Sequence, residues 1–217
     1  MKKILMSVFI FVLLLTGCAS NTEVRESVET SKVSAEESIQ LLNNATKITV
    51  EKQLFSLANK YSVIVEGEEV ATVEGKIANM FGDKFTMYDT DGNVIVEEKE
   101  IKRFGRLNRS AEIKDNEDNV IGYIGEETVT KFTSIGYYFH FFDKDKEQIG
   151  ISDQVNISVL KKNNFKDNDG NIDYTVKKNF DIVNSYDIEI ADKNDIPLYF
   201  AILMVCIEDA IASAEEK

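Results

Sequence analysis

The amino-acid sequence predicts a mainly β protein, a meander of about ten to twelve antiparallel strands that closes into a barrel around a C-terminal α-helix. One observation behind this prediction is a hairpin unit that recurs along the chain, in which alternating aromatic and aliphatic residues precede a polar turn and a second strand. The other is the stretch 196–207, which is apolar on every side and therefore needs an enclosure. A closed sheet of this many strands leaves an interior that such a helix can fill.

The N-terminus has the layout of a secretory signal. Residues 1–3 are basic after the initiator, residues 4–15 are almost entirely apolar, and this run is too short to span a bilayer comfortably. The motif LTGC at 15–18 resembles a bacterial lipobox. The resemblance implies a signal peptide at 1–17, a diacylglycerol thioether on Cys18, and a protein anchored by its lipid at the extracytoplasmic face of the cell membrane. Two acyl chains give stable attachment, whereas one gives only marginal attachment.

Residues 18–33 lack apolar periodicity and are predicted to be a flexible tether from the lipidated cysteine, which leaves 34–217 as a single domain. The domain begins with a capping-box pattern, Ser34 followed by Glu37, and apolar residues at helical spacing predict a short helix there. From Ile48 onward the apolar residues alternate with period two, which indicates strands.

The hairpin units follow this first strand. Their copies span 85–96, 111–123 and 138–151, a weaker copy spans 61–73, and 186–192 opens a further one. Each copy contains a polar turn of the Asp, Asn and Gly type between two strands with aromatic and β-branched residues. The regular order of these units is what predicts the meander.

Two of the polar turns, Asp89–Asn93 and Asp167–Asn171, begin like the calcium loop of an EF-hand. The position at which that loop requires glycine holds Val94 or Ile172, and both turns are flanked by predicted strands instead of helices. We therefore interpret them as structural hairpin turns and predict no metal site and no cofactor. A loose extracellular calcium site is the alternative.

The apolar stretch 196–207 is predicted to be a helix, with Asn194 and Asp195 as its cap. Its length of about 18 Å falls short of the roughly 30 Å hydrocarbon core, so we expect it inside the barrel and not across the membrane. Its side chains, among them Ile202, would then fill the interior. If the helix lay outside, the barrel would be open to a small apolar ligand.

Three segments occur in an order that points to a known family. They are Leu54–Leu57 ahead of the first hairpin, the repeated hairpins such as Lys84–Asp89, and the closing segment 186–192 with the apolar helix that follows it. Together they resemble the tubby C-terminal-like superfamily and, within it, the LURP-one-related branch, over roughly 54–212. The resemblance implies a closed barrel of about twelve strands around a central hydrophobic helix. It also implies a mostly non-enzymatic family, in which tubby proteins bind phosphoinositide head groups through basic residues and phospholipid scramblases share the fold.

The charge balance is strongly acidic, with 25 Lys and Arg against 38 Asp and Glu and a formal net charge of -13. Removal of the signal peptide would remove two lysines and no acid, so the mature chain would be more acidic still. This balance argues against nucleic-acid binding, which needs clustered cations on a positive face. A single segment departs from it. Its cations are Lys99, Lys102, Arg103, Arg106 and Arg109, and Gly105 among them predicts a bend.

This basic segment has two interpretations. Its cations could grip an anionic lipid or a wall polymer, or they could belong to a strand edge that charge protects from aggregation, which is the commoner use of such residues. The basic site of tubby proteins is not carried over, because these residues match no family motif. Phosphoinositides are also not expected outside a bacterial membrane.

Catalysis has little basis in the sequence. The single histidine, His140, lies in an aromatic strand, and Cys206 lies in the apolar helix, where burial blunts the reactivity of a thiol. Only Cys206 remains once Cys18 is lipidated, so counting excludes a disulfide within the chain. We expect a non-enzymatic, surface-anchored binding or scaffold module, whose partners are the membrane, through the lipid, and an anionic lipid, envelope polymer or envelope protein. The alternative is a carrier or sensor that holds a small apolar ligand inside the barrel.

Overall fold

The computed structural model describes most of the domain that follows the tether. The described ranges are 34–54, 59–76, 84–102, 104–131, 134–155, 162–180 and 184–215. The signal peptide and the tether predicted for residues 1–33, and with them Cys18, lie outside the described residues, as does Arg103.

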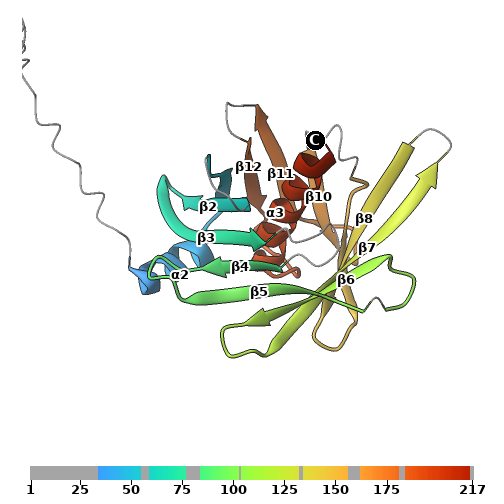
Figure 1. Ribbon diagram of the computed structural model, residues 1–217, viewed down its shortest axis with the longest axis horizontal. Coiled ribbons are helices and arrows are strands. Elements are labelled where there is room, and N and C mark those ends of the chain that lie inside the picture. The colour runs from blue at the N-terminus through green and yellow to red at the C-terminus, as the bar shows by residue number, and fades with distance from the viewer. Residues whose placement is uncertain are drawn as a thin grey trace, which may run out of the picture. The chain divides into compact units, whose positions relative to one another are not determined.

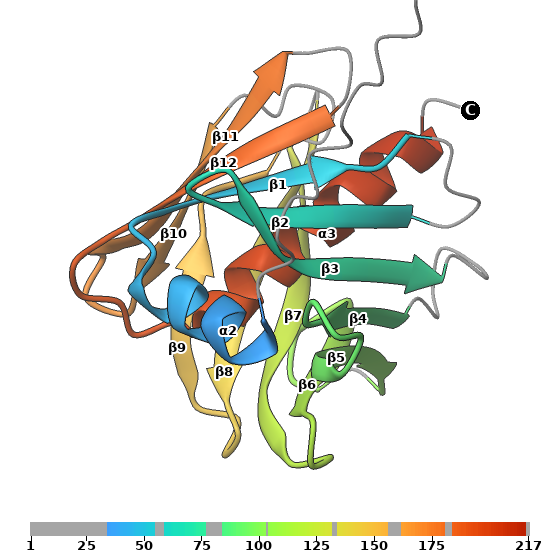
Figure 2. The same ribbon diagram turned by 90° about the vertical axis from the view of Figure 1, so that its left-hand side faces the viewer.

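The described strands form a closed antiparallel barrel of twelve members (Figures 1 and 2). They are β1 (Lys47–Lys52), β2 (Asn59–Val65), β3 (Glu68–Lys76), β4 (Lys84–Tyr88), β5 (Val94–Ile101), β6 (Arg109–Asp115), β7 (Val120–Lys131), β8 (Ser134–Asp143), β9 (Gln148–Ser152), β10 (Lys162–Asp167), β11 (Ile172–Phe180) and β12 (Asn184–Ile190). Each strand pairs with the strands before and after it in the chain, and β12 closes the ring against β1. This confirms the predicted barrel.

The closing pair shows why one predicted hairpin is wrong. The segment 186–192 was expected to open another hairpin, but it forms β12, which pairs with β11 on one side and with β1 on the other. In the register of this pair, Ile48 lies opposite Ile188 and Val50 opposite Tyr186. A hairpin would have paired β12 with a following strand, whereas here the first strand of the chain, β1, pairs with it. All four side chains are buried.

Four of the hairpins share one five-residue turn. These turns span 89–93, 115–119, 143–147 and 167–171, and in each of them the first residue is Asp and its Oδ1 accepts the backbone N–H groups of the third and fifth residues. In three of them an Asn at the fifth position also donates to Oδ2 of the Asp. In the turn 115–119, the hydrogen bonds to Asp115, above all the one from the Asn119 side chain, lower the pKa of the Asp115 carboxyl group. The first Asp of each turn is therefore used to fix the backbone of the turn. No group of three metal-binding side chains occurs among the described residues.

The N-terminal helix α2 (Ala35–Asn44) forms where the capping box predicts it. The Glu37 N–H donates to Ser34 Oγ at 3.3 Å, which satisfies one of the free amides of the first turn. Leu42 is buried, and the helix packs against β3 at the outside of the ring (Figure 2). The structure thus confirms the short N-terminal helix.

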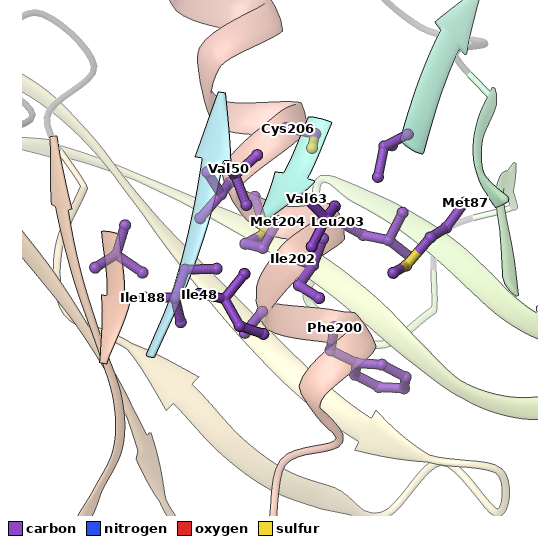
Figure 3. Close-up of a cluster of buried hydrophobic side chains, with 14 of the residues drawn as sticks. Ile48, Val50, Val63, Met87, Ile188, Phe200, Ile202, Leu203, Met204 and Cys206 are labelled. Carbon is purple, nitrogen blue, oxygen red and sulfur yellow. The ribbon is translucent and has the colours of Figure 1, made fainter. Parts of the chain in front are cut away.

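The C-terminal helix α3 (Leu198–Glu215) runs through the middle of the ring of strands (Figures 1 and 2). Residues 200–206 are all fully buried, and Figure 3 shows side chains of the surrounding strands, such as Val50 and Val63, gathered around Ile202 and its neighbours. Since residues 198–207 of α3 are apolar on every side, this enclosure is what their sequence requires. No helix among the described residues is long and apolar enough to cross a membrane.

Glycines in the wall make room for Phe200 of α3 and for Ile196 just before the helix. A Cβ placed on Gly122 would lie 2.6 Å from the Phe200 ring, and one placed on Gly150 would lie 2.6 Å from Ile196 Cδ1. Real side chains do not approach so closely, so glycine at these positions lets the helix and the wall meet.

The boundaries of α3 differ from the prediction at both ends. Asn194 and Asp195 were expected to cap the helix, but the segment before α3 is instead bound to β11. Asp173 Oδ2 of β11 accepts the N–H groups of Asp195 and Ile196 at 2.8 Å each. At the other end the helix continues past Ile207 to Glu215. Glu208 and Asp209, which follow the predicted stretch 196–207, are buried and find partners inside the barrel.

Candidate functional site

The structure brings four of the five predicted basic residues onto one hairpin. Lys99 lies exposed on β5, directly opposite Glu112 of β6, and Lys102 and Arg106 are exposed in the connection between the two strands. Arg109 begins β6 and is only partly exposed, with its guanidinium 3.9 Å from the Glu126 carboxylate. The exposed cations that the structure describes are therefore Lys99 on β5 and Lys102 and Arg106 in the connection.

The described part of this connection, residues 102 and 104–108, is folded back onto the outer wall of the barrel, and we call it the basic strap. The ring of Phe104 packs edge-on against Tyr123 of β7 and Phe142 of β8, with centroid distances of 5.7 and 5.1 Å. Leu107 covers Gly125 of β7, where a Cβ would lie 2.3 Å from Leu107 Cδ1. Two apolar side chains thus hold the strap against the wall.

The backbone of the strap is fixed as well. The Asn108 N–H donates to the Glu126 carbonyl at 2.7 Å, and the Leu107 N–H donates to the Phe104 carbonyl. Gly105 has a φ of 62°, a conformation that favours glycine, so the bend predicted there is confirmed. Lys102 and Arg106 consequently project from a segment whose position is defined by packing and hydrogen bonds.

A further cation, Lys146, joins the strap from the turn between β8 and β9. Its Nζ lies 5.1 Å from the ring centroids of both Phe104 and Tyr123, within the range of a cation–π interaction. Sequence reasoning missed Lys146 because it belongs to a different hairpin. The only signal available was the alternation of β7 and β8, which places Tyr123 and Phe142 directly opposite each other on one face.

Protection of a strand edge does not account for these charges. β5 pairs with β4 and β6, and β6 pairs with β5 and β7, so neither strand is an edge. The interpretation of the basic segment as edge protection is therefore wrong for this barrel, because closure removes the unpaired backbone groups that such charges protect.

The two residues considered for catalysis are both occupied by structural contacts. His140 Nε2 lies 2.9 Å from Glu127 Oε2, and its Nδ1 lies 3.2 Å from Gln148 Oε1, all on the outer face of the barrel. Cys206 is fully buried in α3, and burial raises the pKa of its thiol well above the usual value, which keeps it protonated.

A second polar cluster lies inside the barrel, around Asp209 of α3. Its fully buried carboxylate accepts hydrogen bonds from Lys52 Nζ at 2.7 Å, Asn184 Nδ2 at 2.7 Å, Tyr186 Oη at 2.8 Å and Tyr61 Oη at 3.0 Å. Burial by itself would raise the pKa of Asp209, but these donors outweigh it and hold the pKa below its usual value. The cluster joins the helix to β1, β2 and β12.

Sequence reasoning did not find this interior cluster. Its members come from strands at opposite ends of the chain, and nothing in the local spacing of Lys52 or Tyr61 marks either of them as a partner of the helix. Since donors from β1, β2 and β12 converge on the Asp209 carboxylate, we interpret the cluster as an attachment of α3 to the wall.

The comparisons with known proteins agree with this architecture. The model of the LURP-one-related family (LOR) matches residues 46–207, which include nearly the whole barrel and most of α3. Neither the curated proteins nor the solved structures provided a match. From the extent of the family match, together with a closed barrel whose axis is filled by a helix, the chain belongs to the LURP-one-related family.

Proposed function

We propose that this protein is a non-enzymatic binding module, anchored by a lipid on Cys18 at the extracytoplasmic face of the cell membrane, that contacts an anionic lipid or envelope polymer through the basic strap. The observation that carries the proposal is the strap itself. It displays Lys102 and Arg106 on a chain with a formal net charge of -13, and Phe104 and Leu107 hold it in place.

The outer wall is proposed as the binding surface because α3 occupies the axis of the barrel. A carrier for a small apolar ligand would need that axis open, and residues 200–206 fill it with buried side chains. Neither His140 nor Cys206 is poised for chemistry, since the histidine is paired with Glu127 and the thiol is buried. An envelope protein with an acidic surface is the remaining class of partner that the strap would suit.

Charge complementarity predicts which face of the barrel would meet an anionic surface. An anionic surface attracts the strap and repels the acidic remainder of the domain, so the barrel would approach with the outer face of β5 to β8 towards it. Each Lys or Arg near such a surface contributes about 1 kcal/mol, a contribution that is lost within a Debye length and weakens with salt. Binding should therefore fall as ionic strength rises and should depend on Lys102 and Arg106.

Cys18→Ser tests the anchoring half of the proposal. In a bacterial host that processes lipoproteins, the variant should fail to incorporate labelled palmitate and should move from the membrane fraction to the soluble extracytoplasmic fraction or the medium. Cys206→Ala is the matched control, because it removes the other cysteine and should leave both labelling and location unchanged. Palmitate labelling that persists in Cys18→Ser would show that Cys18 does not carry the lipid.

A further inference from the structure

Glu208 of α3 and Asn163 of β10 face each other in the barrel with incomplete hydrogen bonding. Both are almost completely buried, at 2% exposure each, and Asn163 Nδ2 donates to Glu208 Oε1 at 3.1 Å. The remaining oxygen of each side chain, Glu208 Oε2 and Asn163 Oδ1, is buried and has no hydrogen-bond partner among the described residues. Two acceptors left over on residues that already share one hydrogen bond indicate that a proton belongs between them.

We propose that Glu208 carries a proton at neutral pH and that its Oε2–H donates to Asn163 Oδ1, so that the two side chains form a doubly hydrogen-bonded acid–amide pair whose deprotonation loosens the end of α3 from β10. A neutral carboxylic acid has one donor and one acceptor, and a primary amide has the complementary set. The pair would satisfy both atoms that otherwise remain without partners. An ionised Glu208 would instead place an uncompensated charge in the interior.

The surroundings of Glu208 favour the neutral form. Burial raises its pKa to about 8, and the hydrogen bond from Asn163 opposes this only in part. Among the described residues, charged and titratable groups on the elements around this end of the helix include Lys52 of β1, Tyr61 of β2, Lys178 of β11, Tyr186 of β12, and Cys206 and Asp209 of α3. Lys52 forms an ion pair with Asp209. Burial raises the pKa of Tyr61, Tyr186 and Cys206, so these three side chains remain neutral as well.

The pair lies where it can join β10 of the barrel wall to the central helix α3. β10 pairs with β11 from Lys162 onward, but its register with β9 involves only Phe165–Asp167 among the described residues. Asn163 lies ahead of that register, so its side chain joins this part of the wall to the helix inside. Loss of the second hydrogen bond would therefore be felt at Asn163, a residue whose strand pairing among the described residues is with β11 alone.

The sign of the pH dependence follows from the two states of Glu208. In the unfolded chain its pKa is near the usual 4.5, and in the folded protein it is about 8. Between these values the unfolded state has lost the proton that the folded state keeps, so stability falls as pH rises, with the unfolding constant increasing about tenfold per pH unit from this group. Below about pH 4.5 the proton is bound in both states and the penalty is absent.

Glu208→Gln tests the proposal in the full-length protein held in detergent micelles. Glutamine keeps the shape and presents an N–H to Asn163 Oδ1 at every pH, so urea unfolding of this variant between about pH 5 and 8 should lose the component attributed to Glu208. Glu69→Gln is the matched control, since Glu69 is exposed and the same charge is removed. Its unfolding should follow the wild type.

Infrared difference spectroscopy of the unmodified protein keeps the proposal testable if Glu208→Gln does not fold. A band from the C=O stretch of a protonated carboxylic acid should be present at pH 7 and should disappear above about pH 8. Absence of this band at pH 7, or an unchanged pH dependence of unfolding in a folded Glu208→Gln variant, would overturn the proposal and indicate an ionised, hydrated Glu208.

Discussion

Ile202→Asp should abolish folding of the domain. Ile202 is fully buried in α3 and points into the ring of strands (Figure 3), so an aspartate there would leave a carboxylate without a donor in the interior. Loss of the buried aliphatic side chain alone costs about 2–5 kcal/mol, and the unpaired charge adds several more, which together match the whole stability of a typical domain. Circular dichroism of the purified variant should show no cooperative thermal transition.

Ile202→Val is the control for this result. It removes one methylene and should cost only about 1 kcal/mol, with a cooperative transition retained at a slightly lower temperature. If Ile202→Asp also melted cooperatively near the wild-type temperature, α3 could not lie on the axis of the barrel.

Lys52→Met should destabilise the domain by about 3 kcal/mol, because breaking a buried ion pair leaves the other charge uncompensated. The methionine retains the packing of the lysine stem, while Asp209 keeps its three neutral donors Tyr61, Asn184 and Tyr186. Urea unfolding at pH 7 measures this loss. Lys47→Met on the same strand is the matched control, since the Lys47 side chain is largely exposed and its bridge to Asp187 should contribute no more than about 1 kcal/mol.

The effect of Lys52→Met should depend on pH. In the wild type, Asp209 has a lowered pKa, so its contribution to stability is present above its unfolded pKa and is lost as the pH falls through the folded pKa. Without Lys52, burial is opposed less strongly, the pKa of Asp209 rises, and a proton can neutralise the carboxylate at acid pH. The difference in stability between variant and wild type should therefore shrink as the pH falls towards about 4. A gap that stays constant would mean that Asp209 is not the group left unpaired.

The features that the sequence predicts correctly are those that neighbouring residues determine. Period-two alternation locates the strands, the capping box locates α2, and the Asp-rich segments form turns because the carboxylate of Asp89 or Asp167 binds amides within its own five residues. The apolar character of 200–206 requires enclosure in any fold.

The features that the sequence does not predict depend on partners far along the chain. β12 resembles the start of a hairpin because its own residues carry no sign that β1 completes it. In the sequence, Glu208 and Asp209 simply follow the apolar stretch. Nothing near them in the chain indicates that their hydrogen-bond partners lie on β10, β12, β1 and β2. Lys146 enters the neighbourhood of the strap only after β7 and β8 have paired. The roles predicted for Cys18 and Arg103 remain predictions, since both residues lie outside the described ones.

Binding of the lipid-free protein to anionic surfaces is the most direct test of the proposed function. The full chain carrying Cys18→Ser would be sedimented with phosphatidylglycerol vesicles, with phosphatidylcholine vesicles and with an immobilised glycerol-phosphate polymer across a salt series. We expect salt-sensitive binding to one of the anionic probes and none to phosphatidylcholine. Lys102→Glu with Arg106→Glu should weaken it by about thirtyfold or more, because reversing two surface cations removes at least about 2 kcal/mol.

The matched control for this charge reversal is Lys162→Glu with Lys193→Glu, which makes the same change in net charge at exposed positions on β10 and in the loop before α3. It should retain most of the binding. If the lipid-free protein binds neither anionic probe at low salt, or if the two charge reversals have equal effects, the basic strap is not the binding surface and the lipid on Cys18 would be the only proposed contact with the membrane.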